Sequence, residues 1–262
     1  MCMFLRNAIC AAGTLFVMSG VGYAQTTQVG NTVDASTIVT GSGAGGNREI
    51  RQDSPIFRDD RLNANQSGNA QIILVDDTKI VVGPNSQVDI DDFAYSSDNT
   101  FATLTVRASR GAFRFVSGNS PSTAYKIATP TGTIGVRGTT FDIQVGDRTE
   151  ATVVDGSIIM CPNNRRNNIV GDPEGCTELS GWCSYAAMSN DGVEDVGRLP
   201  EKAKEEREDK FPLMAEMESE LNPQFRQQGI SCASDLAALI DPRIRAQVND
   251  NDPPGGNSVS PN

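Results

Sequence analysis

The stretch of sequence that decides the fold is Thr129–Val145, TPTGTIGVRGTTFDIQV. Its last part alternates apolar Phe141, Ile143 and Val145 with polar residues. This alternation is typical of a strand with one apolar face, because successive side chains of a strand point to opposite sides. Glycine permits positive φ and close backbone approach, so the glycines before this run predict sharp bends between short strands. The glycines in question are Gly132, Gly135 and Gly138.

The preceding residues carry similar short apolar runs separated by turn residues. Gln71–Val75 and Lys79–Val82 flank Asp76 and Asp77, which predicts a hairpin. Within Thr100–Ala108, the apolar residues Ala102, Leu104 and Val106 alternate with polar ones and lie on one face. Such runs recur roughly every ten residues with no helical period between them, a pattern that indicates an all-β domain. A sandwich, a barrel and a short solenoid all fit this pattern.

Several blocks of the sequence resemble the FecR domain family. The form TPxxxIGVRGTxF of the stretch quoted above looks like the signature of that family, and residues 74–78 (LVDDT), 83–86 (GPNS) and 111–118 (GAFRFVSG) look like its other motifs. The resemblance covers roughly residues 52–162. It implies a short-stranded, β-solenoid-like or rolled double-layer domain in which the signature residues are structural. These are Thr129, Pro130, Gly132, Gly135, Arg137, Gly138, Thr139 and Phe141.

The FecR resemblance also implies a role in signalling or envelope sensing through protein–protein contact, without catalysis. Membrane-spanning FecR sensors have a cytoplasmic segment that binds a sigma factor, followed by a membrane span. In this sequence only a signal peptide precedes the β domain. The resemblance therefore implies the sensing or scaffolding half of that role, with another envelope protein as the partner.

The first 24 residues have the features of a cleaved secretory signal peptide. Arg6 supplies a positively charged start and residues 8–17 are mostly apolar. In Gly22-Tyr23-Ala24, glycine and alanine stand at the positions where a signal peptidase needs small residues. A transmembrane anchor is the alternative, but the apolar run is short and Gly13 and Gly20 interrupt it. We expect a periplasmic or secreted protein without stable membrane insertion.

Four cysteines remain after removal of such a leader, and an even number in an oxidising compartment predicts two disulfides. They are Cys161, Cys176, Cys183 and Cys232. Four cysteines allow three pairings, and sequence alone does not choose between them. We favour Cys161–Cys176, which closes a loop after the last strand pair, and Cys183–Cys232, which ties the C-terminal region back. A four-thiolate metal site is the alternative, but it favours closer CxxC spacings.

The composition narrows the possible functions. The sequence has 22 Lys and Arg against 33 Asp and Glu, a net charge of −11, and loss of Arg6 with the leader makes it −12. Nucleic acid needs basic patches, so we expect no nucleic-acid partner. The sequence has no histidine, which excludes serine triads, cysteine–histidine pairs and histidine metal ligands. We expect that the protein has no catalytic activity and binds no cofactor. A carboxylate-based glycan hydrolase is the alternative.

Three further features offer ligand-binding alternatives. The acidic residues Asp89, Asp91 and Asp92, with Asp76 and Asp77, could hold calcium, or they could serve turns and strand edges. Arg137 could bind an anion or pair with a nearby carboxylate. Trp182, the only tryptophan, could stack on a sugar or pack over a disulfide. A glycan- or small-ligand-binding module is therefore a second class of function.

The C-terminal region changes to a helical composition. Glu201–Lys210 is mostly charged, with Glu206 and Lys210 spaced as an i,i+4 pair, and Pro212 interrupts the pattern. A further short helix is expected from Ser234 to Ile240. Between them lies an apolar stripe at helical spacing, which docks on the β domain or serves as the contact for a partner. The stripe consists of Leu213, Met214, Met217 and Leu221.

The domain organisation that the sequence predicts has five parts. They are a signal peptide (1–24), a flexible segment (25–48), a FecR-like β domain (49–190), a helical C-terminal extension (191–248) and a disordered tail (249–262).

Overall fold

The computed structural model describes residues 27–36, 38–96, 99–163, 173–199, 204–215, 217–227 and 232. Its elements in chain order are β1 (Gln28–Ser36), β2 (Val39–Ser42), β3 (Arg48–Ile50), β4 (Pro55–Phe57), β5 (Arg61–Ala64), β6 (Asn69–Leu74), β7 (Lys79–Val82), β8 (Gln87–Tyr95), β9 (Phe101–Val116), η1 (Ser122–Ala124), β10 (Tyr125–Thr129), β11 (Gly132–Val145), β12 (Thr149–Pro162), η2 (Pro173–Gly175), β13 (Thr177–Ser180), β14 (Ser184–Ser189), β15 (Gly192–Arg198), α1 (Lys204–Lys210), η4 (Glu218–Glu220) and η5 (Pro223–Phe225).

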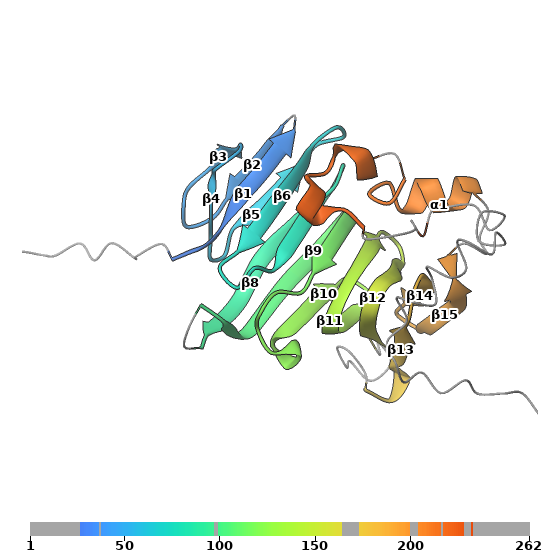
Figure 1. The fold of residues 1–262 in the computed structure, drawn as a ribbon. Coiled ribbons are helices and arrows are strands. Elements are labelled where there is room, and N and C mark those ends of the chain that lie inside the picture. The colour runs from blue at the N-terminus through green and yellow to red at the C-terminus, as the bar shows by residue number, and fades with distance from the viewer. Residues whose placement is uncertain are drawn as a thin grey trace, which may run out of the picture.

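The fifteen strands form one sheet (Figure 1), which confirms the expected all-β class. Strand pairs are antiparallel except β9 with β10, which run parallel. Along the main path the order runs from β15 to β4, and these two end strands do not pair with each other, so the described sheet is not closed. The helix α1 is short, and within the described ranges no helix is long and apolar enough to cross a membrane.

The three longest strands bend at glycines and change partners there. β9 pairs with β8 and β10 before Gly111, and with β7 and β11 from Gly111 onward. β12 pairs with β13 on one side of Gly156 and with β14 on the other. Gly111, Gly138 in β11 and Gly156 have φ of 97°, 62° and 82°. Glycine adopts this left-handed backbone without the steric penalty of a Cβ, so these residues let one sheet change direction.

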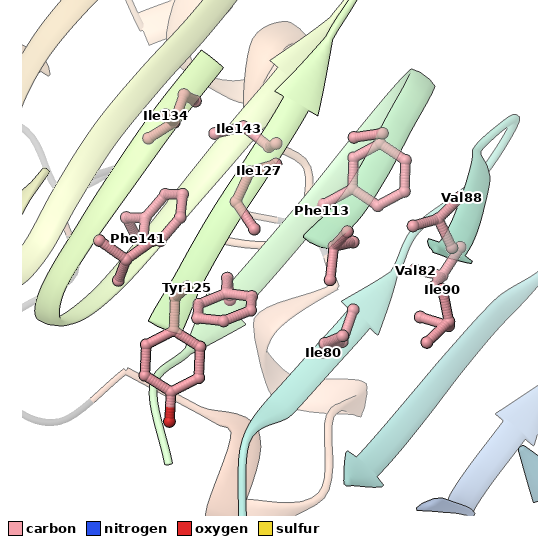
Figure 2. Packing of buried hydrophobic residues seen from close by; sticks show 14 of the residues in the cluster. Ile80, Val82, Val88, Ile90, Phe113, Tyr125, Ile127, Ile134, Phe141 and Ile143 are labelled. Carbon is pink, nitrogen blue, oxygen red and sulfur yellow. The ribbon is translucent and has the colours of Figure 1, made fainter. Parts of the chain in front are cut away.

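The parts of the sheet on the two sides of the bends contribute to a single hydrophobic core (Figure 2). Ile127 of β10 and Ile134 of β11 enter it from the side that precedes Gly138. From the other side it receives Ile80 of β7, Phe113 of β9 and Phe141 of β11. Each of these side chains is at most 4% exposed. Full burial of a side chain of this size stabilises the fold by about 1.5–3 kcal/mol, so this core holds the two halves of the sheet together.

The stretch quoted first contains one turn and one long strand, in place of several short strands with a bend at each glycine. Thr129 ends β10, residues 130–131 form the turn, and β11 begins at Gly132. β11 spans 14 residues, and its pairing with β12 is irregular only between Arg137 and Phe141, around Gly138. Gly135 lies in regular pairing, where an added Cβ would be 2.8 Å from Ile159 Cγ2. At Gly132 an added Cβ would be 2.3 Å from the Cys161 carbonyl oxygen. These two glycines therefore allow close strand approach, and only Gly138 makes a bend.

The N-terminal segment also differs from the expectation. Residues 25–48 were expected to be flexible, yet β1 and β2 are strands of the sheet. β1 pairs with β6 and β4, and its Val29 is fully buried in the core, which fixes the segment in place. The predicted boundary after residue 190 falls in the turn between β14 and β15, so the region beyond it begins with a strand.

The described part of the C-terminal extension contains less helix than the sequence predicted for it. α1 forms within the predicted charged helix, with its Glu206–Lys210 ion pair at 2.9 Å. Residues 212–215 and 217–221 contain turns and η4 in place of a helix, and Pro212 and Pro223 limit any regular helix between them. The predicted signal peptide, the helix at 234–240 and the tail at 249–262 lie outside the described residues.

We predict that the bend glycines differ in their tolerance of alanine. Gly156→Ala should lower the free energy of unfolding by more than 2 kcal/mol, roughly, because its Cβ would lie 2.3 Å from the Gly138 carbonyl oxygen in a left-handed backbone. Gly138→Ala should cost about 1 kcal/mol, since its Cβ meets no atom within 4 Å. Urea unfolding measures both values. Gly192→Ala, at a site with open space and no positive φ, is the control, and equal losses in all three variants would contradict the bend assignment.

Candidate interaction surface

The second face of the sheet, which we call the outer face, is covered by the C-terminal region. Along β9, Phe113 and Phe115 enter the core, so Ala112 and Arg114 point to the opposite side. The residues of the outer face used below are Gln71, Ile73, Val81, Ala112, Arg114 and Asp142. Residues 211–227, which we call the cover, lie on this face, with Glu216 outside the described residues. Figure 1 shows the cover in orange beside β6 and β9.

Arg114 is the polar centre of the outer face, and its side chain has no exposed surface. Its Nε and Nη2 donate to Oδ1 and Oδ2 of Asp142 at 2.7 and 2.9 Å. Its Nη1 donates to Glu218 Oε2 at 2.7 Å and to the Phe225 carbonyl oxygen at 3.0 Å. Nη2 also donates to the Leu213 carbonyl oxygen at 3.3 Å. The five N–H donors of a guanidinium are thereby matched by five acceptors, two from the sheet and three from the cover.

The charges around Arg114 keep it ionised. Burial lowers the pKa of its guanidinium, but the charges and hydrogen bonds of Asp142 and Glu218 outweigh this effect and hold the pKa above its ordinary value. Asp142 is the direct cross-strand neighbour of Arg114 in the β9–β11 pair. The sheet itself therefore presents a charged pair, and the cover completes it with Glu218.

The candidate partner-contact residues of the sequence analysis lie in the cover and are mostly buried. Leu213, Met214 and Leu221 are 1%, 2% and 0% exposed, and Met217 is partly buried. Leu213 and Leu221 pack with Phe225 against the sheet. The structure thus differs from a free partner-binding helix, because these side chains already cover the apolar surface of the outer face.

The cover is attached to the sheet through side chains. Besides the Arg114 contacts, Gln71 Oε1 accepts a hydrogen bond from the Asn222 backbone N–H at 2.7 Å. The backbone hydrogen bonds of residues 211–227 that the structure describes join them to one another and, at Phe211, to Arg207. Among the described residues, therefore, the cover adds no strand to the sheet.

A second contact fixes α1 next to the cover. Lys210 Nζ donates to Glu150 Oε1 of β12 at 2.7 Å, and the rings of Phe211 and Tyr185 meet edge to face at 6.2 Å. Burial raises the pKa of the Tyr185 phenol, and with Glu150 nearby it reaches about 12. Burial lowers the pKa of Lys210, but Glu150 and Glu206 outweigh this and raise it above its ordinary value. These groups therefore hold α1 through charges and hydrogen bonds that persist over the neutral range.

The two disulfides have the favoured connectivity. Cys161 is joined to Cys176, and Cys183 is joined to Cys232. Cys183 and Cys232 are both fully buried, in a cluster that includes Phe211 and Met214. The second disulfide therefore ties the chain beyond the cover to the start of β14. Two disulfides fit a protein located outside the cytoplasm.

Arg137 and Trp182, the two residues considered individually as ligand-binding groups, are not among the outer-face residues described above. Arg137 has a 60% exposed side chain and lies 3.6 Å from Glu178, so it pairs with a carboxylate as the non-ligand alternative expected. Trp182 is partly buried and packs on the cluster that contains the Cys183–Cys232 disulfide. No arrangement in the described part of the chain combines these two residues into a single site.

Among the acidic residues considered for calcium, Asp76 and Asp77 have partners of their own in the fold, and the side chain of Asp92 is not among those that the structure describes. Asp89 and Asp91 line an open hollow with Ser42, Gly43, Asp59 and Arg61. Asp89 accepts both hydrogen bonds of a fork from Arg61, and Asp91 pairs with Arg107. Within the ranges that the structure describes, no group of three or more acidic or cysteine residues could hold a metal ion. The carboxylates of this hollow are engaged by arginines, as expected for strand-edge ion pairs.

Asp76, from the LVDDT block, has a structural role instead. It is 2% exposed, and its Oδ2 accepts hydrogen bonds from the hydroxyls of Thr78, Ser120 and Tyr125 at 2.9, 2.6 and 2.8 Å. Its Oδ1 accepts one from the Thr78 backbone N–H at 3.0 Å. Asp76 thus fastens the β6–β7 turn to the connection between β9 and β10.

These features define an all-β protein whose single open sheet carries a buried core on one side and a disulfide-linked C-terminal cover on the other. Residues 60–158 match the family model described as FecR protein. The chain therefore carries a FecR domain, as the sequence resemblance suggested. The match ends within β12 and leaves out the cover, α1 and β1 to β4.

Comparison with solved structures gives weaker similarities. Two crystal structures of a protein from Parabacteroides distasonis, described as a "putative anti-sigma factor", are 14% identical to this chain, with TM-scores of 0.38 and 0.39. In both cases the match covers 53% of this chain and 59% of the other, so the chain spans less than two thirds of those proteins. A structure described as a cell surface anchoring domain has 28% identity and a TM-score of 0.24, covering 25% of this chain and 88% of that one. No curated protein matches the chain.

Arg114 and Asp142 are the two central residues of this surface that the sequence pattern did not predict. Both were visible as charged residues inside apolar alternation, between Phe113 and Phe115 and between Phe141 and Ile143. A charge in such a run normally faces solvent. Only the β9–β11 register, which brings them face to face, and the cover, which buries them, show their role.

We predict that the protein is much more sensitive to loss of the buried Arg114 than to loss of a half-exposed arginine of the same strand. Arg114→Met leaves Asp142 buried without its charge partner and should lower the free energy of unfolding by about 3–5 kcal/mol. The double variant Arg114→Met/Asp142→Asn removes the unpaired charge and should recover part of that loss. Urea unfolding measures both. Arg107→Met, which breaks the half-exposed pair with Asp91, is the matched control with an expected loss of about 0–1 kcal/mol. An equal loss at both arginines would contradict the assignment.

We also predict that the α1 contact weakens in alkali. The pKa of Tyr185 rises from 10.0 in its ordinary state to about 12 in the folded chain, and the pKa of Lys210 is also raised. Stability from both groups is therefore fully present below pH 10, roughly, and is lost as the pH rises through the folded-state values. Unfolding curves between pH 7 and pH 12 should show the decline only above about pH 10. In Tyr185→Phe the alkaline decline should be smaller, and an unchanged decline would contradict this account.

Proposed function

We propose that this chain is an exported, non-enzymatic FecR-domain protein that acts in envelope signalling, sensing or scaffolding through contact with another envelope protein. The observation that carries the proposal is the FecR match over residues 60–158. The proposed domain order is a signal peptide over residues 1–24, the β domain with β15, and a C-terminal extension that includes the cover. In this proposal the change of direction at Gly111, Gly138 and Gly156 corresponds to the rolled double-layer form of the domain.

The chemistry of the described residues supports a non-enzymatic role. The buried charged groups Arg114 and Asp142 are engaged with each other and with the cover. Two further strongly buried carboxylates also have partners in the fold: Asp60 pairs with Arg48, and Asp76 is held by hydroxyl groups. General acid–base catalysis needs a titratable group poised next to a substrate-sized site, and these groups serve packing contacts instead. The sequence contains no histidine that could substitute for them.

Location outside the cytoplasm is supported by the chemistry of the cysteines. Both disulfides close within the chain, one after β12 and one at the end of the cover. Such bonds form and persist in oxidising compartments such as the periplasm. The signal-peptide features of residues 1–24 give the proposed route of export.

The proposal is tested by crosslinking the full-length chain in cells of its own source, followed by denaturing pull-down and mass spectrometry. We expect one or a few envelope proteins to be crosslinked reproducibly, and the recovered chain to begin near Gln25. The matched control lacks residues 1–24, remains where it is synthesised, and should not capture the same proteins. If no envelope protein were crosslinked above the level of the control, the protein-contact role would be contradicted. Hydrolysis of an envelope glycan that is lost on one Asp→Asn or Glu→Gln change would contradict the non-enzymatic role.

A further inference from the structure

We propose that the outer face is a peptide-docking surface and that the cover is a hinged flap, which occupies this surface in cis. The inference rests on the proposed function, because it names the surface through which the protein contact would run. The partner that fits this surface is an acidic peptide segment with aliphatic or aromatic anchors, resembling residues 211–227 of this chain.

The first observation is how the cover is anchored. The Leu199 backbone N–H donates to the Cys183 carbonyl oxygen at 2.9 Å, and the side chain of Cys183 forms the disulfide with Cys232. Residues 199–232 therefore form a loop whose two ends are both fixed at Cys183. The middle of that loop reaches across the outer face to Gln71 of β6. With its ends fixed at Cys183, this loop stays attached when the side-chain contacts that hold it on the sheet open.

The second observation is that lifting the cover breaks no strand pairing. Its described contacts with the sheet are side-chain contacts: the hydrogen bonds of Arg114 and Gln71, and the packing of Phe211, Leu213, Met214, Leu221 and Phe225. The ladders of β6, β7, β9 and β11 lie entirely within the sheet. Segments that open independently of the core have this kind of attachment, with few hydrogen bonds to the rest of the fold.

The third observation is the chemistry that the outer face offers to a ligand. Ile73, Val81 and Ala112 supply a flat apolar surface. Arg114 supplies three hydrogen bonds to the cover, two of them to backbone carbonyl oxygens and one to a carboxylate. Backbone carbonyls exist in every peptide, so this recognition does not depend on residues 211–227 being part of the same chain. The third of these hydrogen bonds goes to the Glu218 carboxylate of the cover. Arg114 therefore favours peptide segments that carry a carboxylate at the matching position.

Hydrogen exchange of the full, disulfide-bonded chain tests the flap. The backbone amides of Met214, Glu220 and Phe225 in the cover should exchange by local opening, with protection factors at least about tenfold lower than those of buried β9 and β11 amides. Glu218→Gln, which weakens the bond to Arg114, should lower cover protection by a further factor of roughly ten while leaving β9 and β11 unchanged. Glu220→Gln, an exposed carboxylate on the same η4 turn, is the matched control and should change neither. If the amides of the cover exchanged only through global unfolding, the proposal that the cover is a flap would be overturned.

Binding of a synthetic peptide with the sequence of residues 211–227 tests the docking surface. The peptide should bind the Glu218→Gln chain saturably and at least about tenfold more tightly than the unchanged chain, since the weakened cover competes less. A peptide with Gln in place of the residue corresponding to Glu218 should bind at least about tenfold more weakly. Equal binding to both chains, or no binding despite cover opening, would overturn the docking surface. Neither result depends on finding an envelope partner, so failure of the proposed function would be seen separately in the crosslinking experiment.

Discussion

The fold depends on a buried arginine that is shared between the sheet and the C-terminal cover. An unpaired guanidinium in an apolar interior would be too costly to retain, and even a paired one gains little over an apolar replacement unless every donor is satisfied. Arg114 meets that condition only when Asp142, Glu218 and two carbonyl oxygens of the cover are all in place. The formation of the sheet and the docking of the cover are therefore linked through a single side chain.

The bends in the sheet are a second constraint, because they decide which residues share the core. β9 passes from one group of partners to another at Gly111, and β12 does so at Gly156. If these strands were straight, their two halves would cover separate surfaces, each too small for a stable core. The bends place Ile127 and Phe141 in the same buried cluster. The glycines with a left-handed backbone conformation are thus the local reason why the two parts of the sheet share one core.

The sequence predicted the features that depend on local pattern. Alternation and turn residues indicated an all-β chain, the motif blocks pointed to the FecR domain, and the order of the cysteines favoured the disulfides found. The apolar residues Leu213 and Leu221 were recognised as a docking stripe, but their helix was not formed. Their spacing fits a helix and also fits turns that follow the surface of a sheet, and only that surface decides between the two.

The features that the sequence did not predict all depend on partners distant in the chain. Val29 is buried because its strand β1 pairs with β4 and β6, which come later in the chain, so a Gly- and Thr-rich composition suggested flexibility where β1 is a strand. The partners of Arg114 include residues about a hundred positions later. Gly135 and Gly138 look alike in sequence, and only the register with β12 separates close strand approach from a bend. Strand register is therefore the information that a single sequence lacks here.

The closure of residues 199–232 at Cys183 also has a consequence for the integrity of the molecule in a protease-rich environment. A peptide bond cut within this loop would not release a fragment, because the downstream piece stays linked to β14 through the disulfide. The nicked chain would keep its full mass until a reductant reached that buried bond. A protease can therefore cut this loop without removing any part of it from the protein.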